Sequence, residues 1–271
     1  MPEAAPSTLY GLHDFFASVG RDWDLVVNGR PGRSLMMPEI VGAGGAPVPG
    51  ANGVTIPVTR GFDDDLRPDI ICVPEVLCPP DFLDAETYRE ACNWLRSKYE
   101  AGSVIASVCS GSMLLAQSGL LDGREATTHW GFCDAMRRMF PAVKVHESRA
   151  LVATGEGQRI VTGGGGSSWH DVALYLVSRF AGIEEAVRIA KLYLIEWHAE
   201  GQLRFASLSV ARQFRDPLIA ACQEWIADHH AEPHPVTTRS ILVCRYSSKR
   251  SRIAPDPAGC SGAIGETYAT R

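Results

Sequence analysis

The sequence predicts an α/β protein in which a parallel sheet is covered by helices on both faces. Short apolar runs alternate along the chain with segments of helical periodicity. Buried strands that alternate with helices are typical of a parallel sheet flanked on both sides. One apolar run ends at Cys109 and passes through small residues into a helical pattern, which predicts a tight strand-to-helix turn. In proteins of this class, the functional site lies at the edge of the sheet formed by the carboxyl ends of the strands.

The first part of the chain contains two expected helices and three expected strands. Residues 8–18 have apolar side chains at helical spacing, and Gly20 follows them. A second helix begins at its cap, Asp84, and runs to about Tyr99. The expected strands cover residues 24–27, 54–58 and 69–74.

The rest of the chain continues the alternation. The run into Cys109 leads to a short helix that ends at Gly119. Further helices are expected over residues 128–139, 169–180 and 183–197, and short strands over residues 143–145, 150–152 and 160–162. The glycine loop 163–168 has no lysine after its glycines. We therefore interpret it as a tight turn, and we expect no nucleotide or other cofactor.

Cys109 is the principal candidate for a chemically active residue. Ser110 and Gly111 allow a sharp turn, and the helix that follows places amide N–H groups beside the sulfur, which favours the thiolate. His129, twenty positions later, could arrive from the next loop as a partner. The alternative is a buried cysteine that acts as a small apolar side chain at a close strand–helix crossing. Both interpretations stay open at this point.

The composition excludes several classes of protein. The chain has 271 residues and a net charge of −5, which argues against a protein that is mainly an electrostatic nucleic-acid binder. Eight scattered cysteines without a Cys-x-x-Cys pair predict reduced thiols and no metal site. No secretion signal or membrane-spanning run is present, so we expect a cytoplasmic location and no membrane partner.

Four motifs resemble the ThiJ/PfpI superfamily, relatives of class I glutamine amidotransferases with a flavodoxin-like fold. They are Val-Cys-Ser-Gly-Ser-Met-Leu-Leu-Ala at 108–116, Gly-Leu-Leu-Asp-Gly at 119–123, Ala-Thr-Thr-His-Trp at 126–130 and Gly-Gly-Gly-Ser-Ser-Trp at 164–169. The pattern is similar to the amino-terminal domain of GlxA-type regulators, which join such a domain to an AraC-type DNA-binding domain. The resemblance covers roughly residues 8–236. It implies a flavodoxin-like three-layer sandwich followed by a short helical remnant of a helix-turn-helix domain.

The resemblance also implies a domain organisation. We expect the ThiJ/PfpI-like domain over residues 1–200, a linker over 201–215 and the first helix of an AraC-type domain over 216–235. Residues 236–271 carry six basic and two acidic side chains without helical periodicity, and we expect a disordered or out-of-frame tail. In the family a buried central strand precedes the first helix, whereas this sequence starts with Met1 where that strand should be finished. We therefore expect that the start site is placed too far downstream.

The superfamily's enzymes use the elbow thiol as a nucleophile and backbone N–H groups to stabilise an oxyanion. By resemblance Cys109 would be the nucleophile and the Ser110 amide one of the donors. The second donor usually comes from a Gly-Gly pair, where this chain has Glu75 and Val76. Glu75 follows a strand end and could reach the elbow, or it could be a solvated loop residue. If it acts on the thiol, we expect Glu75→Gln to raise the pKa of Cys109.

Three functions follow from these observations. The first is the ligand-sensing half of an AraC-family regulator, a homodimer that binds an unidentified small-molecule effector. It would bind DNA only through a helix-turn-helix domain, which we expect to be truncated in this chain. Its Cys109, Ser110, His129 and Glu75 would be vestigial or would line a sensing pocket. The second is a cysteine-dependent hydrolase, hydratase or deglycase of small molecules, free of metal and cofactor. The third is a non-functional product of a disrupted gene.

Overall fold

The computed structural model describes residues 3–81, 84–196 and 202, which all lie in one compact unit, Met1–Ala206. Three expected segments lie outside the described residues: the linker over 201–215 (apart from Gln202), the helix over 216–235 and the tail over 236–271. Within the described part of the chain, no helix is both long enough and apolar enough to span a membrane.

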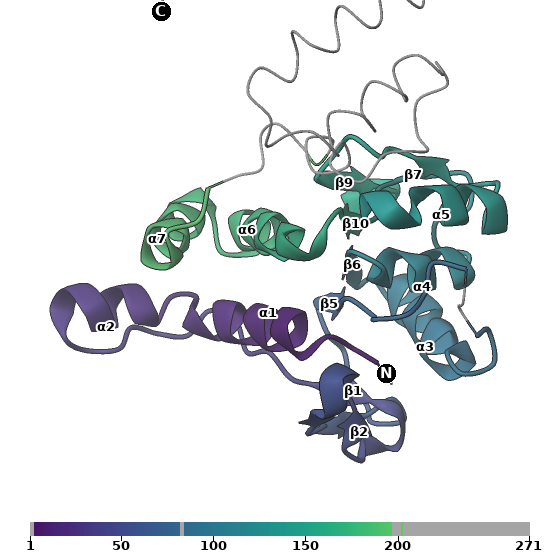
Figure 1. The fold of residues 1–271 in the computed structure, drawn as a ribbon. Coiled ribbons are helices and arrows are strands. Elements are labelled where there is room, and N and C mark those ends of the chain that lie inside the picture. Colours follow the sequence, from purple (N-terminus) through teal and green to yellow (C-terminus); the bar gives the residue numbers. More distant parts are fainter. Residues whose placement is uncertain (1–2, 82–83, 197–201, 203–271) are drawn as a thin grey trace, which may run out of the picture. The chain divides into compact units, whose positions relative to one another are not determined.

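The central sheet has the strand order β5-β6-β10-β9 (Figure 1). Three of these strands are parallel: β5 (Ile70–Val73), β6 (Val104–Val108) and β10 (Ile160–Gly163). The fourth, β9 (Leu151–Thr154), pairs antiparallel with β10, so the sheet is mixed rather than wholly parallel. The connection between them contains only the short 3-10 helix Glu156–Gln158, and a link of that length can join only antiparallel neighbours.

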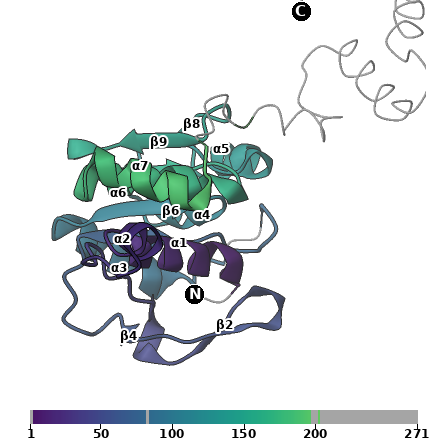
Figure 2. The same ribbon diagram turned by 90° about the vertical axis from the view of Figure 1, so that its left-hand side faces the viewer.

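Helices cover both faces of this sheet, as the sequence predicts (Figures 1 and 2). On one face lie α1 (Pro6–Ser18), α6 (Trp169–Phe180) and α7 (Ile183–Tyr193), which share an apolar core with β6 and β10. On the other face lie α3 (Arg89–Glu100), α4 (Gly111–Gln117) and α5 (Cys133–Met139), which form a second core with the same strands. The fold is therefore a three-layer α/β sandwich.

The remaining strands are short pairs outside the central sheet. One pair is β1 (Val41–Gly42) with β4 (Arg60–Gly61), and another is β7 (Glu125–Ala126) with β8 (Lys144–Val145). The strand expected over residues 54–58 is reduced to β3 (Thr55–Ile56), which pairs antiparallel with β2 (Val48–Pro49). Pro57 ends it, because proline has no N–H to continue a ladder.

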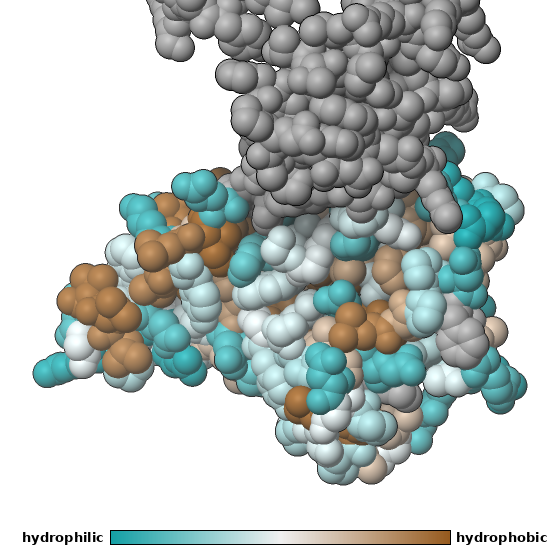
Figure 3. Space-filling view, viewed as in Figure 1, coloured by the Kyte–Doolittle hydropathy of each residue, from teal (hydrophilic) through white to brown (hydrophobic). Residues whose placement is uncertain are grey.

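The prediction of a strand over residues 24–27 is wrong, because these residues form part of the helix α2 (Asp22–Asn28). A strand needs a neighbour for its backbone groups, and within the described residues no strand lies on that side of β5. A helix satisfies its own backbone but leaves the apolar side chains uncovered. Leu25, Val26 and Val27 are 45%, 69% and 58% exposed. Figure 3 shows apolar surface gathered over this helix.

Candidate functional site

Cys109 occupies the sharp turn between β6 and α4, as the sequence predicts. Its φ of 55° is in the left-handed region, which is rare for residues other than glycine and is typical of a nucleophile elbow. Two hydrogen bonds hold its backbone in this conformation. The Cys109 N–H donates to the carbonyl of Gly163 over 3.1 Å, and the Thr128 hydroxyl donates to the carbonyl of Cys109 over 2.8 Å. The surrounding strands therefore support the strained turn.

The end of β5 is tied to this elbow through Ser110. The Ser110 hydroxyl accepts a hydrogen bond from the Val76 N–H over 2.9 Å and donates one to the Val76 carbonyl over 2.6 Å. Gly111 permits the close approach, because a Cβ at this position would lie 2.5 Å from the carbonyl oxygen of Pro74. These contacts place Glu75, which lies between Pro74 and Val76, directly beside the elbow.

The structure brings Glu75 and Cys109 together. The Cys109 Sγ donates to the Glu75 Oε1 over 3.3 Å, and the Thr8 hydroxyl in α1 donates to the other carboxylate oxygen over 3.4 Å. The Ala5 N–H donates to the main-chain carbonyl of Glu75 over 2.8 Å, which fixes the backbone of this residue. The carboxylate that faces the sulfur thus belongs to Glu75, just after the end of β5. The helix α1 contributes the hydroxyl of Thr8 to the same site.

These surroundings keep the Cys109 thiol protonated at neutral pH. Burial raises its pKa strongly, and the negative charge of Glu75 raises it further. The backbone N–H and the hydroxyl of Ser110 lower the pKa by smaller amounts. The direction of the Glu75 effect is opposite to the one expected from the sequence, and from the structure we expect Glu75→Gln to lower the pKa of the thiol.

The two expected oxyanion donors differ in their surroundings. The Ser110 N–H lowers the pKa of the Cys109 thiol, whereas the Val76 N–H donates to the Ser110 hydroxyl. Val76 could stabilise an oxyanion only after this hydrogen bond is broken. The resting site therefore holds an uncharged thiol beside a carboxylate, with the Val76 N–H already bonded.

His129 lies beside the site without a direct bond to the sulfur. Its Nδ1 accepts the N–H of Gly131 over 3.1 Å, and its ring packs against Trp130. Within the described part of the chain, His129 forms no hydrogen bond to Cys109. Burial lowers the pKa of its imidazole, and the nearby Glu75 opposes this shift. The geometry therefore makes His129 a wall of the site.

The glycine loop completes the site by letting other groups approach it closely. A Cβ at Gly165 would lie 3.6 Å from the ring of His129, and one at Gly166 would lie 3.5 Å from a carboxylate oxygen of Glu75. A Cβ at Gly164 would lie 2.9 Å from the side chain of Gln202. The loop is thus a tight turn, and its backbone passes close to the side chains of Glu75, His129 and Gln202.

Sequence reasoning missed Gln202 as a residue of this region. Its side chain is buried, and its Nε2 donates to the carbonyl of Thr128 over 2.8 Å and to that of Arg149 over 3.3 Å. Its Oε1 accepts the N–H of Trp130 over 3.2 Å. Local sequence gives no signal for these contacts, because all of them join residues more than fifty positions apart.

The described residues contain no group of three or more side chains arranged to hold a metal ion. The five described cysteines, Cys72, Cys78, Cys92, Cys109 and Cys133, are all free thiols. Cys109 can bond to an electrophilic carbon once its proton has moved to Glu75, and the neutral thiol with the neighbouring carboxylate can bind a polar ligand.

Comparisons with known proteins agree with this fold. The model of the DJ-1/PfpI family matches residues 30–178, which is more than half of the chain. A solved structure of a ThiJ/PfpI family protein from Pseudomonas syringae superposes with a TM-score of 0.58 at 22% identity, covering 84% of this chain and 83% of that one. The flavodoxin-like fold predicted from the motifs is thereby confirmed.

Two curated relatives differ in what their names describe. The HTH-type transcriptional regulator CdhR of Pseudomonas aeruginosa is 30% identical over 210 residues, covering 75% of this chain and 58% of the relative. The isonitrile hydratase of Pseudomonas putida is 31% identical over 140 residues, covering 52% of this chain and 58% of the relative. The chain thus spans little more than half the length of either relative.

Proposed function

The chain belongs to the DJ-1/PfpI family, and from this premise we propose that its described domain is the effector-sensing part of a transcriptional regulator. The effector is a small molecule that binds beside Cys109. The similarity to an HTH-type transcriptional regulator over three quarters of this chain supports this function. Binding of DNA belongs to a helix-turn-helix domain, and we expect the regulator to act as a cytoplasmic homodimer.

The 3.3 Å contact between the buried Cys109 thiol and the Glu75 carboxylate is the observation that carries this proposal. A cysteine nucleophile needs a lowered pKa or a base that removes its proton, whereas burial and Glu75 raise the pKa of this thiol. The Val76 N–H, which an oxyanion would need, is bonded to Ser110. A site with a neutral Cys109 thiol and a Val76 N–H that is already hydrogen-bonded is suited to binding a ligand more than to nucleophilic attack on a substrate.

Gln202 supports the proposal because it couples the site to a residue that follows α7 in the chain. Its amide bonds the Thr128 carbonyl, and the Thr128 hydroxyl bonds the carbonyl of Cys109. An effector that displaces the elbow therefore changes the contacts of Gln202 through only two hydrogen bonds. Such a link is what a sensing domain needs in order to transmit occupancy of its pocket.

The test separates binding from turnover. We expect one chemical class in a panel of amino acids, amines and organic acids to raise the melting temperature of the full chain. The effect should be lost in Cys109→Ala or Glu75→Gln, and NMR of the mixture should show the compound unchanged after hours. Consumption of the compound by the wild-type chain would overturn the sensing role. A panel without any stabilising compound would also count against it.

A second function is favoured by the 3.3 Å contact between Cys109 and Glu75 and by the similarity to isonitrile hydratase. In this alternative Glu75 takes the thiol proton while Sγ bonds to an electrophilic carbon. Glu75 then returns the proton to the same carbon, which gives a thioformimidate on Cys109. Water adds to its C=N bond and the resulting adduct expels the thiol, so that a formamide is released and the thiol is restored. Mass spectrometry of Cys109 with an alkyl isonitrile checks it. A covalent adduct together with multiple turnovers would favour this enzyme over the sensor.

A further inference from the structure

Two arginines gather around one tyrosine at the edge of the sheet opposite the Cys109 site. The guanidinium carbon of Arg159 lies 4.2 Å from the centre of the Tyr99 ring, and that of Arg124 lies 5.7 Å from it. Arg159 directly precedes β10, Arg124 directly precedes β7, and Tyr99 lies in the last turn of α3, which leads into β6. All three therefore lie near the amino ends of strands, whereas Cys109 follows the carboxyl end of β6.

Backbone carbonyls and the core hold this cluster in place. The Arg159 Nη1 donates to the carbonyl of Tyr99 over 2.7 Å and to that of Ser103 over 3.4 Å, and the Arg124 Nη1 donates to the carbonyl of Leu120. The Tyr99 ring packs against the core beneath α3. Because the three side chains are half-buried and anchored in this way, a ligand that binds them loses little affinity to ordering them.

The other donors of the cluster have no partner among the described residues. Each guanidinium bonds the protein only through Nη1, so the Nε and Nη2 of both arginines and the Tyr99 hydroxyl form no hydrogen bond there. Neither guanidinium has a carboxylate oxygen within 4.0 Å in this part of the chain. By contrast, Arg137 pairs with Glu147 over 2.7 Å. The cluster thus carries two positive charges without a counter-ion in contact.

Gly155 leaves space at the point where these donors meet. A Cβ at this position would lie 3.2 Å from the Tyr99 hydroxyl oxygen and 3.7 Å from the Arg124 Nε, so both donors border the same point. The φ of Gly155 is 77°, which favours glycine. Any other side chain would fill the space in front of the two donors, and glycine keeps it open.

We propose that Tyr99, Arg124 and Arg159 form a binding site for a phosphoryl dianion, carried by inorganic phosphate or by a small phosphate monoester. The Nε and Nη2 of an arginine are a parallel pair of donors that binds two oxygens of a phosphoryl group, and the Tyr99 hydroxyl donates to another oxygen. The double negative charge balances the two guanidiniums, which one carboxylate would not. This role is independent of the function proposed for Cys109.

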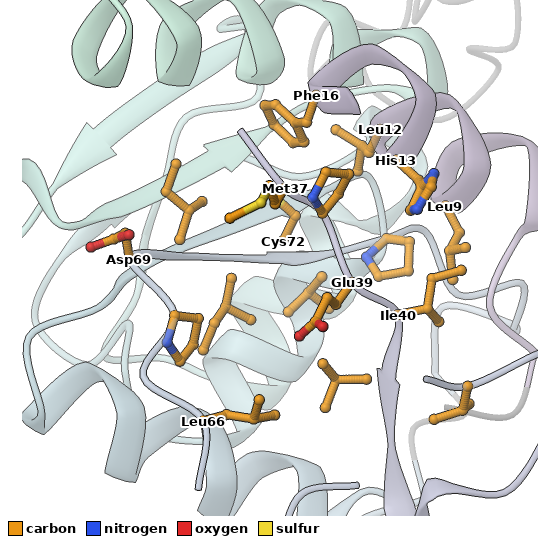
Figure 4. Close-up of a pocket in the computed structure, with 18 of the residues that line it drawn as sticks. Leu9, Leu12, His13, Phe16, Met37, Glu39, Ile40, Leu66, Asp69 and Cys72 are labelled. Atoms are coloured by element: carbon orange, nitrogen blue, oxygen red, sulfur yellow. The ribbon is translucent and has the colours of Figure 1, made fainter. Parts of the chain in front are cut away.

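The apolar cavity beside β5 is a different feature of the domain. Figure 4 shows Leu12 and Phe16 on one side of Cys72 in this cavity, with Leu66 on the other. None of the three residues of the proposed phosphoryl site lines it. Variants at the phosphoryl site therefore leave the lining of this cavity unchanged.

The first experiment is isothermal titration calorimetry of the full chain with inorganic phosphate and with glycerol 3-phosphate at constant ionic strength. We expect binding of a phosphoryl group, and about tenfold weaker binding of acetate, which carries one charge. Whichever of the two phosphoryl compounds binds more tightly identifies the source of the group, free phosphate or an organic monoester. Failure of both compounds to bind would overturn the proposal. Binding of acetate as tight as that of phosphate would also overturn it, in favour of a general attraction of anions.

Variants of the cluster provide the second test. Arg124→Gln removes one charge, and Tyr99→Phe removes only the hydroxyl. The matched control is Arg96→Gln, which removes an exposed charge from the same helix as Tyr99. We expect Arg124→Gln to weaken phosphate binding about tenfold and Tyr99→Phe about threefold, as for the loss of single hydrogen bonds to a charged group, and Arg96→Gln to bind normally.

The circular dichroism spectrum and melting temperature without phosphate show whether each variant is folded. Undiminished phosphate binding by folded Arg124→Gln would contradict the proposal. If Arg124→Gln does not fold, Tyr99→Phe decides, because it keeps the ring and its packing, and undiminished binding by this variant would then contradict the proposal. Cys109→Ala should bind phosphate as the wild-type chain does, which separates this site from the sensing role.

Discussion

The side-chain amide of Gln202 donates a hydrogen bond of 2.8 Å to the main-chain carbonyl of Thr128. Thr128 is the residue whose hydroxyl holds the carbonyl of the strained Cys109. A residue 93 positions beyond the elbow therefore stabilises the loop that stabilises the elbow. This contact makes the stability of the site depend on Gln202.

The first prediction concerns this contact. Gln202→Ala leaves the N–H of Trp130 without its side-chain acceptor and removes the shortest hydrogen bond to the carbonyl of Thr128. We expect a loss of about 1–3 kcal/mol in the free energy of unfolding, since buried groups without partners cost that much. Urea denaturation measures it. The control is Gln117→Ala, whose side-chain oxygen has no hydrogen-bond partner among the described residues. Equal denaturation midpoints for the two variants would show that the contact contributes nothing.

The second prediction concerns the charge beside the thiol. Glu75→Gln removes a negative charge 3.3 Å from Cys109, so the pKa of this thiol should fall and its alkylation by iodoacetamide at pH 8 should become faster. Mass spectrometry of the Cys109 peptide measures the rate. The control is Glu147→Gln, because the Glu147 carboxylate raises the pKa of Cys133. It should change the reactivity of Cys133 and leave that of Cys109 unaltered. A slower reaction of Cys109 in Glu75→Gln would restore the role of Glu75 as a base.

The third prediction concerns alkaline pH. Burial raises the pKa of Cys133 to about 12, well above the value of an unfolded thiol. The unfolded chain therefore loses this proton first, and stability declines as the pH rises above about 8.5. At pH 10 this thiol should lower the free energy of unfolding by about 1–2 kcal/mol relative to pH 7.5. Urea denaturation under reducing conditions measures the difference. Cys133→Ala should show a smaller decline, and an identical decline would assign the effect to other groups.

The fourth prediction concerns the approach of the elbow to β5. Gly111→Ala places a Cβ 2.5 Å from the carbonyl oxygen of Pro74, which is backbone and cannot move without displacing Glu75. We expect a loss of about 1–3 kcal/mol, as for other overpacked positions, together with faster alkylation of Cys109. The control is Gly166→Ala, where the added Cβ meets Glu75 at an ordinary 3.5 Å. If Gly111→Ala has wild-type stability, the backbone at Gly111 and the carbonyl of Pro74 can move apart without cost, and the prediction is wrong.

The sequence predicted those parts of the site that depend on local pattern. The turn at Cys109 follows from small residues between an apolar run and a helix, and the position of Glu75 follows from its place at a strand end. The direction of its effect on the thiol did not follow, because the sign depends on a distance that only the fold sets. Gln202 could not be found for a similar reason, since its partners are main-chain groups far away in the sequence.

The errors in the fold also have physical causes. Residues 24–27 have the composition of a strand, yet strand formation depends on a neighbour that supplies hydrogen bonds, and within the described residues none lies there. The direction of β9 depends on the length of its link to β10, which the pattern of apolar residues does not reveal. Composition thus predicts which segments are apolar, whereas the connections determine how they pair.

The left-handed backbone of Cys109 has a consequence for the substitutions that this position can accept. Side chains branched at Cβ are strongly disfavoured at a φ of 55°, whereas glycine and asparagine tolerate it. Replacement by valine or threonine would therefore disturb the turn, whatever the role of the sulfur. Replacement by glycine would abolish the thiol and leave the turn in place. The shape of the elbow and its chemistry can thus be lost independently, and a descendant of this chain could keep the pocket after giving up the thiol.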